Sequence, residues 1–190
     1  MYLFRVREEV GEVDGISRTL TWAIPHEEIS EMSHVLVIFQ ADTEQTEQLA
    51  LAVGVGAVES EAGIRLRRLR TPGAVEVGHK GYGTLREADL LWADTVVVGL
   101  EGERAGTEEL NGLLVILKEL DPGQMKGKRA WTFGAKGIGK ADAGQTEAQR
   151  VVEESLLAAG ITPLPSVTSA AGDATERMKD VGRQLGREQI

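Results

Sequence analysis

The pentapeptide Val35-Leu-Val-Ile-Phe39 is an unbroken apolar run, and Thr95-Val-Val-Val-Gly99 repeats the pattern farther along the chain. Such runs are typical of strands that are buried on both faces of a sheet. An amphipathic stretch follows the first run at residues 43–58, and after the second run leucines recur at helical spacing from Leu110 to Leu120. Because parallel strands need long crossover connections, this alternation predicts an α/β domain with a parallel sheet and helices on both faces.

Three further strands and three further helices complete the predicted domain. The strands are expected at residues 64–69, 130–133 and 161–167, the first and last near the sheet edges because of interleaved arginines and of Pro163 and Pro165. Capping-box patterns predict helices that begin at Thr84 and at Thr146, and a closing helix is expected over 175–187. We expect Pro122-Gly123 to end the leucine-rich helix.

Residues 1–31 differ from the rest of the chain. They hold three arginines against six glutamates and one aspartate, a net charge of −4, and Met32 stands directly before the first core strand. One interpretation is a mis-assigned start at residue 1. The other is a β-hairpin that turns at Val13-Asp14-Gly15-Ile16. Either way, we predict an N-terminal extension over 1–31 and one domain over 32–190.

Composition excludes several classes of protein. The 190 residues carry 21 Lys and Arg against 30 Asp and Glu, a net charge of −9, which disfavours binding to nucleic acid. There is no cysteine and there are three histidines, none spaced as a ligand pair, so we predict no metal site. No apolar run approaches the length of a membrane span, and we expect a cytoplasmic protein that does not associate with membranes.

Ligands of open α/β sheets bind beyond the carboxyl ends of the strands, so the loops at 40–46, 100–106 and 134–144 are the candidates. The third contains Gly134-Ala-Lys-Gly-Ile-Gly-Lys140-Ala141, which fits a nucleotide-triphosphate loop except that Ala141 replaces the hydroxyl that binds Mg²⁺. We therefore predict no ATP hydrolysis. The alternatives are a loop whose backbone N–H groups near Lys136 receive an anionic or electron-rich group, and a plain glycine-rich surface loop.

The framework motifs resemble those of a known family. Ala93-Asp94-Thr-Val-Val-Val-Gly99, Gly127-Lys128-x-Ala130-x-x-Phe133 and Gly182-Arg-Gln-Leu-Gly-Arg187 are similar to the flavodoxin-like NAD(P)H:quinone oxidoreductases, the family of the tryptophan-repressor-binding flavoprotein. The resemblance runs from about Met32 to Arg187. It implies a three-layer sandwich with strand order 2-1-3-4-5, FMN at the carboxyl edge, NAD(P)H and quinone as partners, and a homodimer or homotetramer.

The family cradles the FMN phosphate with a T-x-T-G-x-T loop, and the matching segment here is residues 41–46. Thr43 and Thr46 keep two hydroxyls, and with Gln45 they are the predicted phosphate ligands, but Glu44 stands in the glycine position. Asp42 and Glu47 add like charge, at about 1 kcal/mol or more for each pair with the phosphate. We expect weaker FMN binding than is typical of the family. The alternative is that Asp42 or Thr43 only caps the following helix.

The family's ring loop, T-P-T-R-F-G-N, is replaced here by residues 100–106, without proline or aromatic residue. Glu101 and Glu103 are interpreted either as an acid–base pair or as solvated side chains. Ala158 and Ala159 stand where the family has a histidine pair, so no catalytic residue is assigned. The residues predicted to hold the flavin ring are Gly102, Gly106, Gly134, Ala135, Lys136 and Gly137.

Two functions remain open on this basis. The first is an FMN-dependent oxidoreductase that passes hydride from NAD(P)H through flavin to a quinone. The second is a flavodoxin-like protein that has lost the flavin and serves as a structural or interaction module, because a fold does not determine a function.

Overall fold

The computed structural model describes residues 32–40, 44–70, 81–134, 144–165 and 172–187. Within these, five parallel strands form one sheet in the order β2-β1-β3-β4-β5, which confirms the predicted fold class. The origin and fold of 1–31 lie outside the described residues and stay predictions. The strands are β1 (His34–Phe39), β2 (Gly63–Arg68), β3 (Thr95–Leu100), β4 (Arg129–Gly134) and β5 (Thr162–Pro163).

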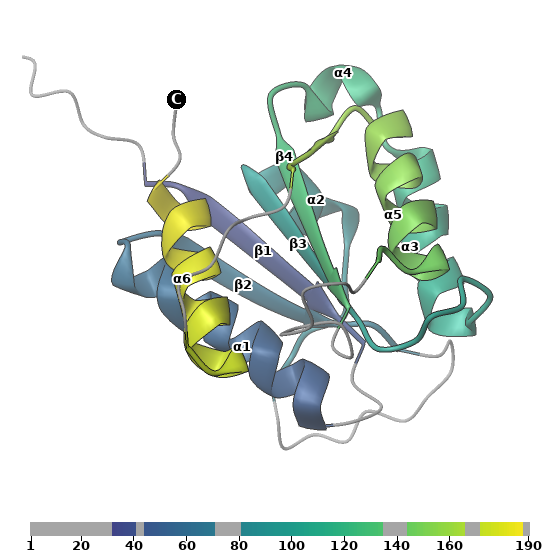
Figure 1. Ribbon diagram of the computed structural model, residues 1–190. Coiled ribbons are helices and arrows are strands. Elements are labelled where there is room, and N and C mark those ends of the chain that lie inside the picture. The colour runs from purple at the N-terminus through teal and green to yellow at the C-terminus, as the bar shows by residue number, and fades with distance from the viewer. Residues whose placement is uncertain (1–31, 41–43, 71–80, 135–143, 166–171, 188–190) are drawn as a thin grey trace, which may run out of the picture. The chain divides into compact units, whose positions relative to one another are not determined.

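Helices cover both faces of the sheet (Figure 1). On one face, α1 (Glu44–Glu59) and α6 (Ala174–Arg187) pack on Val35, Val37 and Phe39. On the other, α2 (Glu87–Trp92), α3 (Glu108–Glu119) and α5 (Glu147–Ala158) pack with Leu36 and Ile38. Successive side chains of β1 thus enter opposite cores, which is why its sequence is apolar at every position from Val35 onward.

Local sequence signals predicted some element ends and missed others. The capping box at Thr146 and Gln149 is present, and Thr107 caps α3 by accepting from the Leu110 N–H at 3.3 Å. The leucine-rich helix α3 ends at Glu119 with Leu120 as its C-cap, directly before the predicted stop at Pro122-Gly123. Pro122 also begins the short helix α4 (Pro122–Met125), which was not predicted. Proline suits a first helical turn, where its missing N–H has no intrahelical partner.

The last predicted strand is shorter than expected. It pairs with β4 only at Thr162 and Pro163, at the edge of the sheet where its prolines placed it. The N–H groups of Thr162 and Leu164 donate to the Lys128 and Ala130 carbonyls at 3.0 and 2.6 Å. The N–H that Pro163 lacks therefore falls on the side of the strand that faces away from β4, where an edge strand tolerates proline.

The start of α2 differs from the prediction because a tertiary contact decides it. The helix begins at Glu87 after Arg86, and Asp89 caps it by accepting from the Arg86 N–H at 3.1 Å. The same carboxylate accepts two hydrogen bonds from Arg67 of β2, at 2.7 and 2.8 Å, and one from Arg65 at 3.2 Å. Thr84 therefore does not cap this helix.

The interactions of Asp89 yield a pH-dependent prediction. Burial raises the pKa of Asp89, but the hydrogen bonds from Arg67 and from the Arg86 backbone, together with the positive charges of Arg67 and Arg65, outweigh burial and leave the pKa below its ordinary value. The stability that this carboxylate contributes is therefore present above its unfolded-state pKa and is lost as the pH falls through its lower folded-state pKa.

We expect Asp89→Asn to lower the free energy of unfolding by about 2 kcal/mol at pH 7, because charged hydrogen bonds to two arginines are weakened. Urea denaturation at pH 7 and at successively lower pH would show the difference shrinking in acid. Glu176→Gln, which removes the exposed pair with Lys179, is the matched control and should leave the free energy of unfolding nearly unchanged, because solvent screens an exposed pair. If the loss in free energy of unfolding caused by Asp89→Asn is the same at every pH, the ionised Asp89 carboxylate does not stabilise the fold as described.

Candidate functional site

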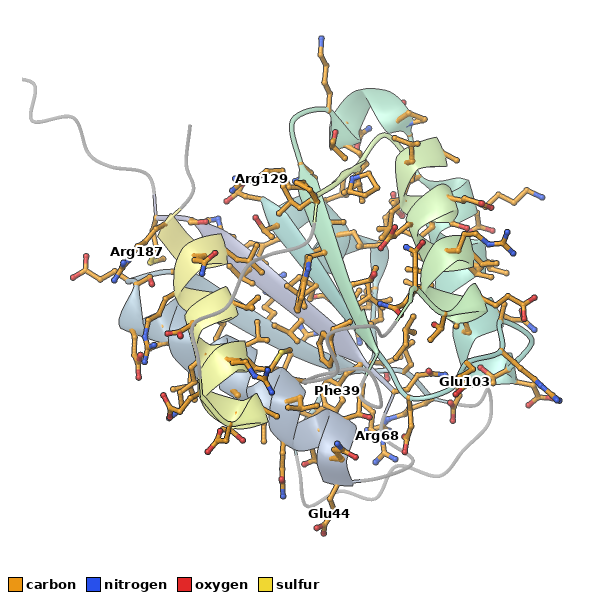
Figure 2. All side chains as sticks on the ribbon, in the orientation of Figure 1. Phe39, Glu44, Arg68, Glu103, Arg129 and Arg187 are labelled. Carbon is orange, nitrogen blue, oxygen red and sulfur yellow. The ribbon has the colours of Figure 1, made fainter. Side chains whose placement is uncertain are left out.

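The candidate site lies at the end of the sheet where the parallel strands finish. Phe39, Leu100 and Gly134 are the last residues of β1, β3 and β4, so the three predicted ligand loops start from one edge. Figure 2 shows Phe39, Arg68, Glu44 and Glu103 at this end of the domain, whereas Arg129 and Arg187 lie at the opposite end.

Helix α1 begins at this edge, and its first turn contains residues 44–46 of the predicted phosphate segment. Thr46 is fully buried, and its Oγ1 has no hydrogen-bond partner among the residues that the structure describes. Glu44 and Gln45 are exposed, and Figure 2 shows the Glu44 side chain pointing away from the sheet. Thr43 lies outside the described residues. A buried hydroxyl without a partner costs about 1–3 kcal/mol, so its presence in the first turn of a long helix requires an explanation.

Glu47, in the same turn, is engaged by a residue from a distant segment. The Tyr82 hydroxyl donates to Glu47 Oε1 at 3.0 Å, and the Tyr82 ring meets Phe39 edge to face at 5.2 Å between centroids. Burial raises the pKa of Tyr82, the hydrogen bond to Glu47 raises it further, and the positive charge of Arg68 opposes the shift. Tyr82 therefore stays protonated and donating at neutral pH.

Gln40, the first residue after β1, joins two of the loops. The residue is 3% exposed, and its backbone N–H donates to Gly99 O at 2.9 Å. Its Nε2 donates to Thr107 Oγ1 at 3.2 Å, while its Oε1 accepts from the Glu101 N–H at 3.2 Å. Sequence reasoning missed Gln40. The signal present was a polar residue directly after a strand that is otherwise wholly apolar.

The loop after β3 contains two of the predicted ring-binding glycines, Gly102 and Gly106. A Cβ at Gly106 would meet no atom within 4 Å, and one at Gly102 would meet only the Arg104 backbone at 4.0 Å, so packing does not demand glycine at either position. Glu103 is exposed, and its carbonyl accepts from the Ala148 N–H at 3.1 Å, which ties the loop to the start of α5. The roles of Glu101 and Glu103 stay predictions.

The third loop is described only at its two ends. Gly134 closes β4, and a Cβ there would come within 3.3 Å of Gln149 Oε1, the carboxamide of the α5 capping box. Ala135, Lys136 and Gly137 lie outside the described residues, as does most of the glycine-rich motif up to Ala141.

Ala158 and Ala159 lie far from this edge. Helix α5 starts beside the loop after β3 and runs back along the sheet, and the chain then enters β5, whose Thr162 pairs with Arg129 at the start of β4. The two alanines therefore lie at the other end of the sheet from Phe39. Within one chain, these positions do not contribute to the candidate site.

Two surveys of the described residues bear on other classes of function. No group of three or more His, Asp or Glu side chains among them is arranged to hold a metal ion. No helix among them is long and apolar enough to cross a membrane.

Comparison with solved structures establishes the fold. A flavodoxin from the domain Archaea aligns over 80% of this chain and 96% of its own at 13% identity, with a TM-score of 0.55. The diflavin flavoprotein A3 from Nostoc sp. aligns over 82% of this chain and 92% of its own, at 16% identity and with a TM-score of 0.54. Oxidised Flavodoxin 2 from Bacillus cereus aligns over 80% of this chain and 97% of its own, at 15% identity and with a TM-score of 0.55. The sequence matches no family model, and no curated protein is similar to it. The fold is flavodoxin-like.

Proposed function

We propose that this flavodoxin-like protein binds FMN at the carboxyl edge of its sheet, with the phosphate at the start of α1 and the ring between the loops after β3 and β4. The observation that carries the proposal is the buried hydroxyl of Thr46 in the first turn of α1, which has no hydrogen-bond partner among the described residues. The flavoprotein neighbours of the same fold support it.

The first turn of a helix suits a phosphate for two physical reasons. Its N–H groups have no intrahelical acceptors, and the helix dipole favours negative charge there. A phosphate oxygen that accepts from Thr46 as well would satisfy a hydroxyl that otherwise costs free energy in the folded state. Thr43, Glu44 and Gln45 complete the segment that we propose to surround the phosphate, with Thr43 as a second hydroxyl donor.

The charge around this turn is less adverse than the sequence suggests. Glu44 is exposed, where solvent screens its carboxylate, and Glu47 accepts from Tyr82. Arg68 is opposite Phe39 in the register of β1 and β2, and it brings a positive charge to the same edge. These contacts support phosphate binding despite the acids, although weaker binding than in typical flavodoxins stays our prediction.

Bound FMN would supply hydride and electron transfer, and the chain's own residues would position it. Gly102, Gly106, Gly134, Ala135, Lys136 and Gly137 are the residues that we propose to line the ring. As the finer form of the proposal, the protein is a cytoplasmic NAD(P)H:quinone oxidoreductase that forms a homodimer or homotetramer, with 1–31 as an extension. The alternative is a flavin-free interaction module, favoured by the lack of an aromatic residue in the loop at 101–106.

Titration of the purified full chain with FMN and with riboflavin tests the proposal. We expect FMN to bind at least about tenfold more tightly than riboflavin, equivalent to about 1.4 kcal/mol from the phosphate. Flavin fluorescence quenching and calorimetry would measure both affinities. If neither flavin binds at millimolar protein, the flavin-free alternative holds. If FMN binds, anaerobic bleaching of the bound flavin by NADH or NADPH tests the finer proposal of an oxidoreductase.

A further inference from the structure

Gln40 holds both ends of the loop after β3. Glu101 is the first residue of this loop, and its N–H donates to Gln40 Oε1 at 3.2 Å. Thr107 ends the loop as the cap of α3, and its Oγ1 accepts from Gln40 Nε2 at 3.2 Å, with Glu109 Oε2 at 3.5 Å from the same nitrogen. The carboxamide thus spans from the end of β1 to the two ends of a loop more than sixty residues away in sequence.

The direction of these bonds defines the carboxamide orientation. The Glu101 N–H only donates and the Glu109 carboxylate accepts, so the oxygen of Gln40 must face residue 101 and the nitrogen must face residues 107 and 109. At 3% exposure, Gln40 exchanges few of these bonds for water. A side chain at position 40 that lacks a donor facing residues 107 and 109 therefore loses the hydrogen bonds to the far end of the loop.

The loop depends on such an external support because its own residues provide little rigidity. It has no proline and no aromatic residue. No neighbouring atom packs closely against its two glycines, where even an added Cβ would meet nothing nearer than 4.0 Å. Glycine loses more conformational entropy than any other residue when it is ordered, so binding a ligand to an unsupported loop of this kind would be costly. The other tie among the described backbone groups is the Glu103 carbonyl to the Ala148 N–H.

We infer that Gln40 is a positioning residue for the flavin ring, which holds the loop at 101–107 in its binding conformation without touching the flavin. The inference rests on the proposed function. Because the loop would contact the ring and not the phosphate, a substitution of Gln40 weakens the binding of FMN and of riboflavin by the same factor. A substitution at the phosphate end weakens the binding of FMN alone.

The test uses Gln40→Glu, which removes the Nε2 donor and sets a carboxylate against Glu109. We expect the dissociation constants of FMN and riboflavin to rise together by about tenfold.

The double variant Gln40→Glu with Glu109→Gln restores a carboxamide–carboxylate pair with reversed polarity, and most of the affinity for both flavins should return. Gln124→Glu, an exposed glutamine on α4, is the matched control and should leave both affinities unchanged. Gln40→Met, which keeps the length without charge, serves if Gln40→Glu does not fold.

Each outcome has a separate meaning. Unchanged riboflavin affinity in folded Gln40→Glu or Gln40→Met, whatever the melting temperature does, overturns the inference and leaves FMN binding intact. A loss for FMN alone would place Gln40 at the phosphate end and also overturns it. If the unmodified protein binds neither flavin, the proposed function fails first, and the inference fails with it.

Discussion

Replacing Gly56 by alanine is expected to lower the free energy of unfolding by about 3 kcal/mol and the melting temperature by roughly 6–12 °C. A Cβ at Gly56 of α1 would lie 2.0 Å from the backbone oxygen of Lys179 in α6. The opposite contact is equally close, since a Cβ at Gly182 would lie 2.1 Å from Val53 O. Both obstacles are backbone atoms of packed helices, so a methyl group can be accommodated only by separating α1 from α6.

The same interface contains polar contacts that separation of the helices would break. Ser60 donates at 3.0 Å to Arg183 O, and Arg183 Nε pairs with Glu59 Oε2 at 2.6 Å. The loss of these contacts adds to the steric cost. The expected loss of stability is therefore at the upper end of the range of about 1–3 kcal/mol that is typical of overpacked cores.

Gly112→Ala is the matched control for this prediction. Gly112 lies within α3, and a Cβ there would meet no atom within 4 Å. Alanine is favoured over glycine in a helix by about 0.8–1.0 kcal/mol, so this variant should gain stability. Thermal and urea denaturation of the three proteins would measure both effects. A Gly56→Ala protein as stable as the unmodified chain would show that the two helices pack less closely than the structure has them.

Thr46→Val is expected to change stability and flavin binding in opposite directions. Valine has nearly the shape of threonine but no hydroxyl, so it removes the buried group that has no partner among the described residues. The free protein should gain about 1 kcal/mol, because an unsatisfied buried hydroxyl costs about 1–3 kcal/mol. FMN should bind about 10–150-fold less tightly, which corresponds to the loss of one charged hydrogen bond of about 1.5–3 kcal/mol.

Denaturation of the flavin-free protein and titration with FMN and riboflavin measure both halves of this prediction. Riboflavin has no phosphate and should be indifferent to the change. Thr46→Ser keeps the hydroxyl and should retain FMN affinity, which separates the hydrogen bond from any effect of packing. Equal losses for FMN and riboflavin in Thr46→Val would contradict a phosphate at the start of α1.

The elements that sequence reasoning predicted correctly are those whose signals are local. The apolar run at 35–39 must be a strand buried on both faces, because every side chain in it avoids water. Thr146 begins its helix as predicted, since a cap bonds to an N–H only three residues away. The strand order agreed with the family resemblance and could not have been derived from periodicity alone.

The errors and omissions share a different cause. Thr84 had the local pattern of a cap, but Asp89 is held by Arg67, and that ion pair sets where α2 begins. Tyr82 and Glu47 lie 35 residues apart, and Gln40 and Thr107 lie 67 apart. No local pattern encodes such pairs.

The sequence by itself therefore determined the class of the fold, most of its strands and helices, and the three loops that could bind a ligand. Only the tertiary structure decided which side chains meet at the carboxyl edge. Thr46 is buried there with no partner in the part of the chain that the structure describes, Glu44 faces solvent, and Gln40 joins two loops. The physical reason is that hydrophobic patterning acts over a few residues, whereas a hydrogen bond or ion pair needs two groups within about 3 Å. The pairing of β1 with β2 and β3 brings those groups together.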